Sequence, residues 1–261
     1  MMSTLVSYRM ITKDLTRSLQ RTASSPQVER DSKYYLENIQ KVKSIDDFLS
    51  DHRVYSFAMK AFGLEDMIYA KAYMRKVLTE GVDDSKSFAN RLADKRFAEF
   101  AKTFNFARYG ETTTVFSATR EGTVERYVRQ LLEEQAGAEN EGVRLALYFQ
   151  RKAPELKSVY GILADRALLA VVQTALGIPA EASAADIEVQ AKMIEAKLNI
   201  EDFKDPEKLD KFLQRFAAAY DATNMPLAVS APVLTLFGNS AQTAGMGVDL
   251  LMSLQKIKTG L

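Results

Sequence analysis

One helical pattern occurs twice in this chain, with its two copies separated by 114 residues. The first copy runs from Val42 to Leu64 and the second from Leu156 to Ile178. Six positions are identical in the two copies: Lys43, Ser44, Leu49, Asp51, Ala61 and Gly63 recur as Lys157, Ser158, Leu163, Asp165, Ala175 and Gly177. These residues are typical of a buried helix and the glycine that ends it. The repeat therefore predicts a duplicated helical unit rather than a duplicated reactive centre.

The repeat extends on both sides of this stretch. Tyr34 precedes the first copy at the distance at which Tyr148 precedes the second. A later helical pattern recurs 116 residues on, where Asp94, Lys95, Phe100, Ala101 and Phe104 are matched by Asp210, Lys211, Phe216, Ala217 and Tyr220. A short insertion in a loop explains the change of offset, because lengthening a loop costs little free energy. We predict an all-α fold, a multi-helical bundle built from two tandem, sequence-related helical units with amphipathic terminal helices.

The composition agrees with a globular helical protein. Of 261 residues, 47% are apolar and 26% are charged, which is enough apolar material to form a core. The net charge is only +1, so no overall field attracts nucleic acid, and no nucleic-acid partner is expected. The chain has no cysteine, which excludes disulfides, thiol nucleophiles and thiolate metal sites.

Changes of period and helix-breaking residues divide the chain into five predicted segments. These are an N-terminal amphipathic helix (1–27), a first helical repeat unit (28–106), a connecting loop and helix (107–142), a second helical repeat unit (143–220) and a C-terminal loop and amphipathic helix (221–261). Residues 107–123 are rich in Thr, Gly and Ser and lack a helical period. We expect a loop there, with or without a short strand at Thr112–Phe116.

Helix ends are marked most clearly in the first unit. Ser44 is predicted to cap a helix that runs from Ile45 to Phe62, with Asp47 at its positive end and Gly63 as its left-handed stop. The next helix is expected to begin at Glu65 and to end at Gly81. Further helices are expected at 87–104 and 124–135.

The N-terminal segment has two stripes. Residues 1–23 are predicted to form one amphipathic helix, with an apolar face made by Leu5, Tyr8, Ile11, Leu15 and Leu19. A second stripe places a cation at every fourth position, namely Arg9, Lys13, Arg17 and Arg21. Like charges at this spacing repel by a few tenths of a kcal/mol per pair. One interpretation is a helix that docks on an acidic protein partner or a membrane surface. The other is a solvated basic face whose apolar side packs on the body.

A second amphipathic helix is predicted at the other end of the chain, near 245–261. Its apolar positions are Met246, Leu250, Leu254, Ile257 and Leu261. Both terminal helices lie outside the repeated units, so they are expected to pack on each other or on a partner.

Asp51 and Asp165 are the best candidates for a polar role, because an aspartate inside a helix is unfavourable and yet occurs in both copies. One interpretation is a pair of equivalent ligand or general-acid positions. The other is structural, with each aspartate pairing with a cation or capping an adjoining helix. Duplication favours the second, since a structural device is copied with its unit. His52, the only histidine, is interpreted as a helix-surface side chain rather than a general base.

No catalytic motif is present. The sequence has no phosphate-binding loop, dinucleotide fingerprint, zinc-protease motif or nucleophile elbow. Its paired acids, such as Glu133–Glu134, are adjacent, and adjacent residues of a helix do not face one point. We therefore expect no enzyme, no catalytic residue, no cofactor and no metal. No run is long enough to span a membrane, and no secretory signal is visible, so a cytoplasmic location is expected.

Two groups of residues resemble known proteins. Tyr8, Ile11, Asp14, Leu15, Val28, Arg30, Asp31 and Tyr34, with the blocks AFGL (61–64) and ALGI (175–178), resemble a family of all-helical proteins of alpha-proteobacteria. That family is known only as a domain of unknown function and is often encoded among flagellar genes. The stretch GVDLLMSLQKI is similar to the terminal helices of flagellar rod and hook proteins, whose middles, unlike this one, are rich in β-structure. The resemblance implies a multi-helical fold and a flagellar connection, and no catalytic residues.

Three hypotheses follow for function. The first is a non-enzymatic helical protein that takes part in assembly or regulation of the flagellum, with its terminal helices docked on a protein partner, and with export without a signal as an alternative location. The second is a sensor that binds a small molecule in a groove between the two units, near Asp51 and Asp165. The third is an enzyme with isolated carboxylates, for which the sequence offers no converging pair. The sequence predicts neither the partner nor the oligomeric state.

Overall fold

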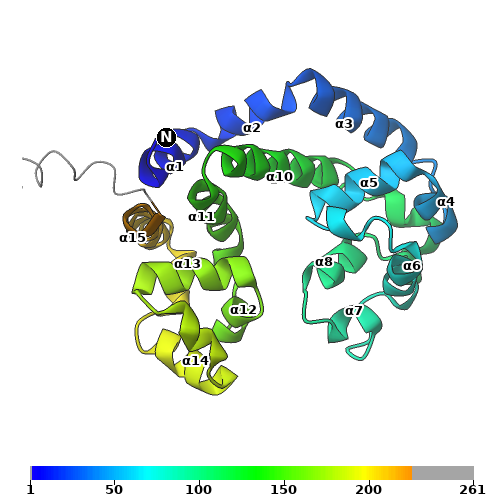
Figure 1. Cartoon of the computed structure of the whole chain (residues 1–261). Coiled ribbons are helices and arrows are strands. Elements are labelled where there is room, and N and C mark those ends of the chain that lie inside the picture. The colour runs from blue at the N-terminus through cyan, green and yellow to red at the C-terminus, as the bar shows by residue number, and fades with distance from the viewer. Residues whose placement is uncertain (1, 225–261) are drawn as a thin grey trace, which may run out of the picture. The chain divides into compact units, whose positions relative to one another are not determined.

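The computed structural model of the protein describes residues 2–224 (Figure 1). Within the described range the regular elements are helices, and no strand occurs. The prediction of an all-α fold is therefore confirmed. The predicted terminal helix at 245–261, with Met246, Leu250, Leu254, Ile257 and Leu261, lies outside the described residues.

The elements follow in chain order. The α-helices are α1 (Thr4–Thr12), α2 (Leu15–Ala23), α3 (Pro26–Ile39), α4 (Ile45–Ser50), α5 (His52–Ala61), α6 (Lys71–Glu80), α7 (Phe88–Arg91), α8 (Arg96–Thr103), α9 (Phe106–Tyr109), α10 (Glu121–Glu139), α11 (Glu141–Lys152), α12 (Val159–Leu163), α13 (Arg166–Leu176), α14 (Ile187–Glu195) and α15 (Pro206–Asn224). Short 3-10 helices lie between them: η1 (Glu65–Met67), η2 (Gly110–Val115), η3 (Ala153–Glu155), η4 (Ala180–Ala184) and η5 (Ile200–Lys204).

The buried apolar residues form two clusters. The first core contains those between Val28 and Val128, and the second contains Tyr8 together with those between Val143 and Phe216. Each core is built from helices that bury one face. In α13, for example, the buried residues recur at intervals of three and four, namely Leu168, Val171, Val172, Ala175 and Leu176.

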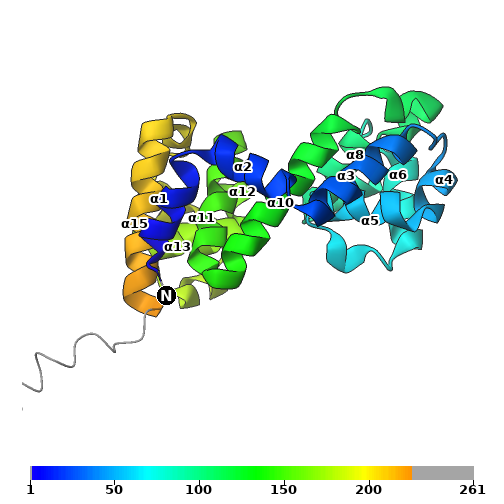
Figure 2. The same cartoon turned by 90° about the horizontal axis from the view of Figure 1, so that it is seen from above.

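Helix α10 joins the two cores. It packs against α5 and α2 as well as α11, and Figures 1 and 2 both show it running beside them. Tyr127 and Val128 in its first half belong to the first core, whereas Ala136 near its end packs against the second. At 121–139 the helix is longer at both ends than the predicted range of 124–135. At its C-terminal end, Asn140 rather than the preceding small residues ends the helix and also caps α11.

Two of the predicted long helices are divided by aspartates. The N-terminal helix expected at 1–27 breaks at Asp14, whose carboxylate accepts a hydrogen bond from the Arg17 amide at 2.9 Å and so starts α2. The helix expected from Ile45 to Phe62 breaks in the same way at Asp51, which separates α4 from α5. The apolar period continues through both breaks, so periodicity alone does not reveal them.

Other predicted boundaries also move. The helix expected from Glu65 onward is a short 3-10 turn followed by α6, and the helix expected at 87–104 is interrupted before α8 begins at Arg96. There the Asp94 carboxylate accepts a hydrogen bond from the Arg96 amide at 2.9 Å. As in the longer helices, a local acceptor competes with the continuous helix.

The alternative of a strand at Thr112–Phe116 is wrong. All of this stretch except Phe116 lies in η2, and buried threonine hydroxyls hold it there by donating to backbone carbonyls. Thr114 donates to the Val42 carbonyl at 2.9 Å, and Thr119 donates to the Thr113 carbonyl at 3.0 Å. Because these hydroxyls occupy the backbone acceptors, they stabilise a compact turn rather than an extended strand.

The predicted cap at Ser44 and the predicted glycine stops at Gly63 and Gly81 are confirmed. Ser44 and Asp47 form a reciprocal capping box at the start of α4. Gly63 and Gly81 have φ angles of +67° and +63°, a region that favours glycine, as expected for residues that end helices. Gly177 ends α13 with φ +61°. The duplication as a whole stays a prediction.

Candidate functional site

The four cations of the predicted basic stripe all lie on the surface. Arg9 lies on α1, Lys13 between the helices, and Arg17 and Arg21 on α2, and all four side chains are exposed. Arg9 donates to the Gln214 amide oxygen on α15 at 2.8 Å. Within residues 2–224, none of the four cations has a carboxylate at ion-pair distance.

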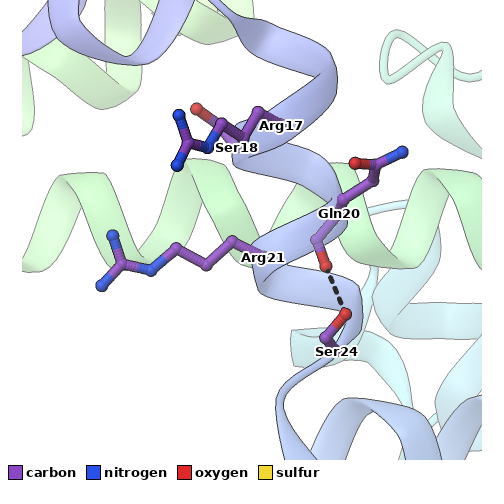
Figure 3. Close-up of a pocket in the computed structure, with 5 residues that line it drawn as sticks. All are labelled: Arg17, Ser18, Gln20, Arg21 and Ser24. Carbon is purple, nitrogen blue, oxygen red and sulfur yellow. Dashed lines mark hydrogen bonds between the residues drawn. The ribbon is translucent and has the colours of Figure 1, made fainter.

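A shallow hollow lies on the outer side of α2. It has a volume of about 500 Å³ and is lined by Arg17, Ser18, Gln20, Arg21 and Ser24 (Figure 3). In Figure 3 the Arg17 and Arg21 side chains extend to the same side of the helix. Ser24 donates its hydroxyl to the Gln20 carbonyl at 2.9 Å, and this bond fixes the end of α2. The two guanidinium groups are free to bind carboxylates through paired N–H donors.

The apolar side of the same segment lies against the body. Tyr8 is 1% exposed within the second core, and Ile11 packs against that core. Leu19 packs against the first core, while Leu5 and Leu15 are half-buried. Thr4 adds a hydrogen bond from its amide to the Asp221 carboxylate at 2.9 Å. The chain itself therefore covers much of this face, as in the second interpretation of the segment.

A second exposed stripe, apolar and not predicted from the sequence, lies on α1 and just before it. Met2, Val6 and Met10 are 54%, 48% and 63% exposed. These three residues are spaced four apart, and Val6 and Met10 lie on the side of the helix opposite the buried Tyr8. This spacing is the sequence signal that predicts a second apolar face. We use the name basic surface for Val6, Met10, Arg9, Lys13, Arg17 and Arg21 together. It combines exposed apolar side chains with unpaired cations.

Asp51 and Asp165 occupy equivalent positions as helix caps. Asp51 begins α5 and accepts hydrogen bonds from the Arg53 and Val54 amides at 3.1 and 3.0 Å. Asp165 begins α13 and accepts from the amides of the residues two and three positions ahead, at 2.8 and 3.1 Å.

A tyrosine hydroxyl donates to each of these carboxylates as well. The Tyr34 hydroxyl lies 3.4 Å from Asp51, and the Tyr148 hydroxyl lies 2.6 Å from Asp165. Burial, followed by the neighbouring Asp165 carboxylate, raises the pKa of Tyr148, which keeps it a neutral donor. Donors of the protein thus already bind both carboxylates, and neither aspartate lines the hollow on α2.

Among the described residues, the most deeply buried charged group lies where α10 meets α11. Glu133 is 2% exposed and accepts hydrogen bonds from Arg129 at 3.1 Å and from Arg151 at 2.8 Å. Arg151 also lies over the Tyr148 ring, 5.2 Å from its centroid. This network joins α10 to α11. A buried carboxylate with two guanidinium partners is fully paired, so its geometry is structural.

His52 does not belong to any cluster of ligating groups. It is exposed at the start of α5, with its Nδ1 3.3 Å from the Ser56 hydroxyl. In the part of the chain that the structure describes, no three acidic or histidine side chains are placed to hold a metal ion. No helix in that part combines the length and apolar character needed to cross a membrane.

Comparisons with known proteins place the chain among relatives without an assigned role. A family model described as "Protein of unknown function (DUF1217)" matches residues 61–209. A crystal structure of a protein from Agrobacterium tumefaciens, an alpha-proteobacterium, superimposes with a TM-score of 0.79 and 48% sequence identity, and the match covers 86% of this chain and 97% of that one. No curated protein matches the chain.

Proposed function

The chain belongs to the DUF1217 family of proteins of unknown function, and from that premise we propose that it is a non-enzymatic helical protein that binds other proteins during assembly or regulation of the flagellum. The proposal is supported most directly by the basic surface. Lys13, Arg17 and Arg21 are exposed cations without a carboxylate partner anywhere in residues 2–224. An acidic partner would relieve their mutual repulsion and provide carboxylates for the guanidinium groups.

The basic surface is also suited to binding because it is held in place before a partner arrives. The opposite side of α1 is anchored by Tyr8 in the second core, and α2 is anchored by Leu19 against the first. A surface that is already ordered loses little conformational entropy on binding. The flagellar part of the proposal is supported separately, by the resemblance of the sequence to proteins encoded among flagellar genes.

The test is affinity purification of the tagged full chain from its native cells. We compare the wild type with Arg17→Glu/Arg21→Glu and expect the variant to capture about tenfold less of the specifically bound protein, or less still. Deleting residues 1–23 is a poorer test, because it would also remove Tyr8 from the second core.

Lys33→Glu/Lys102→Glu is the matched control. These lysines lie on α3 and α8, are exposed, and give the same change in net charge. Identification of the captured proteins then tests the flagellar connection. If both double variants retain the same proteins in the same yield as the wild type, the basic surface is not the binding site.

A further inference from the structure

We propose that the basic surface binds a second copy of this chain, at an acidic surface formed by η4 and the start of α14. This inference rests on the proposed function, because it assigns a partner to the same surface. The acidic surface consists of Glu181, Asp186 and Glu188 with the exposed side chains of Ile187 and Val189.

The acidic surface has the same construction as the basic one, with the charges reversed. Ile187 and Val189 are 57% and 48% exposed, close to the values of Val6 and Met10. Every residue from 183 to 189 is exposed. Both surfaces therefore offer apolar contact area surrounded by charge, which is the usual anatomy of a protein interface.

Like the cations of the basic surface, the acidic side chains of this surface lack ion-pair partners among the described residues. Asp186 stands at the N-cap position of α14 but makes no side-chain capping bond there. Among the described residues, neither Glu181 nor Glu188 has a cation at ion-pair distance. By contrast, the neighbouring acids Glu201 and Asp202 are paired with Lys204 and Lys208. In this segment the unpaired acids therefore lie next to two exposed apolar residues, Ile187 and Val189.

The two surfaces are separate, so one molecule can use both. Helix α1 packs against α11, whereas α14 packs against α12, and Figure 1 shows α14 on the far side of α12 and α13 from α1. A contact between two different patches of identical chains is head to tail, and it continues from copy to copy until the arrangement closes or becomes a filament. Charge complementarity selects this arrangement, since basic against basic or acidic against acidic would repel.

The test is the molar mass of the full chain in solution, measured by sedimentation velocity over a range of protein concentrations. At about 0.02 M salt we expect the mean mass to rise with concentration above the monomer mass of 29.2 kDa, and at about 1 M salt to return to it, because salt shortens the range of charge attraction. Arg17→Glu/Arg21→Glu alone and Glu181→Lys/Glu188→Lys alone should both stay monomeric.

Combining the two reversals makes the test specific. An equimolar mixture of the two double variants should associate again, because the unchanged acidic surface of one variant meets the unchanged basic surface of the other. A single chain that carries all four substitutions should also associate, more weakly than the wild type, because the four substituted positions again place opposite charges on the two surfaces while Arg9 and Lys13 keep theirs. The four-substitution chain has the net charge of the wild type, so a general charge effect would not restore association. The Lys33→Glu/Lys102→Glu variant should associate like the wild type.

Several outcomes would overturn the inference. A wild type that is monomeric at every concentration and salt, or an oligomer that neither reversal affects, excludes the proposed contact. A monomeric chain that sediments with vesicles of anionic lipid would assign the basic surface to a membrane instead. If the chain is monomeric but Arg17→Glu/Arg21→Glu still loses its cellular partners, only this inference fails and the proposed function stands.

Discussion

The two stretches that the sequence predicts to be copies share the capping bonds of one aspartate but differ in their buried side chains. Asp51 and Asp165 both begin a helix and both accept a hydrogen bond from a tyrosine hydroxyl 17 residues earlier in the chain. The buried residue three positions before each aspartate differs, since Phe48 packs against the rings of Tyr55 and Phe104, whereas its counterpart is the aliphatic Ile162. The aspartate cap is thus preserved where the buried side chain is not. Short polar bonds need one particular residue, whereas a core accepts any apolar side chains of suitable volume.

The largest expected effect is a loss of stability when a buried side chain of either core is truncated, and it should be greater in the first core. Phe48 contacts the rings of Phe104 and Tyr55, with centroids 4.9 and 5.9 Å away, and it is fully buried, as is Ile162. We expect Phe48→Ala to lower the free energy of unfolding by about 3–5 kcal/mol and Ile162→Ala by about 2–3 kcal/mol. Urea unfolding followed by circular dichroism measures both. A larger loss at Ile162 would contradict the view that the first core depends on its aromatic cluster.

Alanine substitutions of the two capping aspartates should lower the free energy of unfolding by smaller amounts. Asp165 accepts a short hydrogen bond from a partly buried tyrosine, whereas the Tyr34 hydroxyl lies 3.4 Å from Asp51. Asp165→Ala should therefore cost about 2–3 kcal/mol, for the cap and for the unpaired Tyr148 hydroxyl, and Asp51→Ala about 1–2 kcal/mol for the cap.

Asparagine at each position is the control for the capping aspartates. It keeps the capping oxygen, so it should restore most of the stability in the same urea titration. Equal losses for the two alanine variants would mean that the tyrosine bonds contribute alike. The two sites would then be more similar than their distances indicate.

Sequence alone predicts those parts of the structure that are decided within one turn of chain. Ser44, Gly63 and Gly81 act where they were predicted, because caps and stops depend on a few neighbouring residues. The breaks at Asp14 and Asp51 were missed because a continuous apolar period conceals a local acceptor.

Contacts between distant segments are beyond a single sequence. Periodicity shows that Tyr8 belongs to an apolar face but not that the second core covers that face. It likewise gives no sign that Glu133 finds Arg151, which lies 18 residues along the chain on another helix. The cations of the candidate site were recognised from their spacing, but their lack of partners is a property of the folded surface alone.

The smallest expected effect concerns a cap that only one stretch has. Ser44 and Asp47 form a capping box at α4, whereas Ser158 makes no side-chain capping bond at α12, where Gly161 takes the place of Asp47. Ser44→Ala should cost about 1 kcal/mol and Ser158→Ala close to nothing. Urea titration at neutral pH measures both, and a comparable loss at Ser158 would show that α12 has an equivalent cap after all.

The same cap predicts a dependence on pH. The Ser44 side chain and the Lys43 amide hold the pKa of Asp47 below its ordinary value of 3.8, so the ionised carboxylate favours the folded state. This contribution is complete above the unfolded pKa and is lost as the pH falls through the lower folded pKa. The stability gap between wild type and Asp47→Asn should therefore be constant near neutrality and shrink only below about pH 4. A gap that already narrows between pH 7 and pH 5 would mean that another group stabilises the start of α4. The capping box would then not be what distinguishes the two stretches.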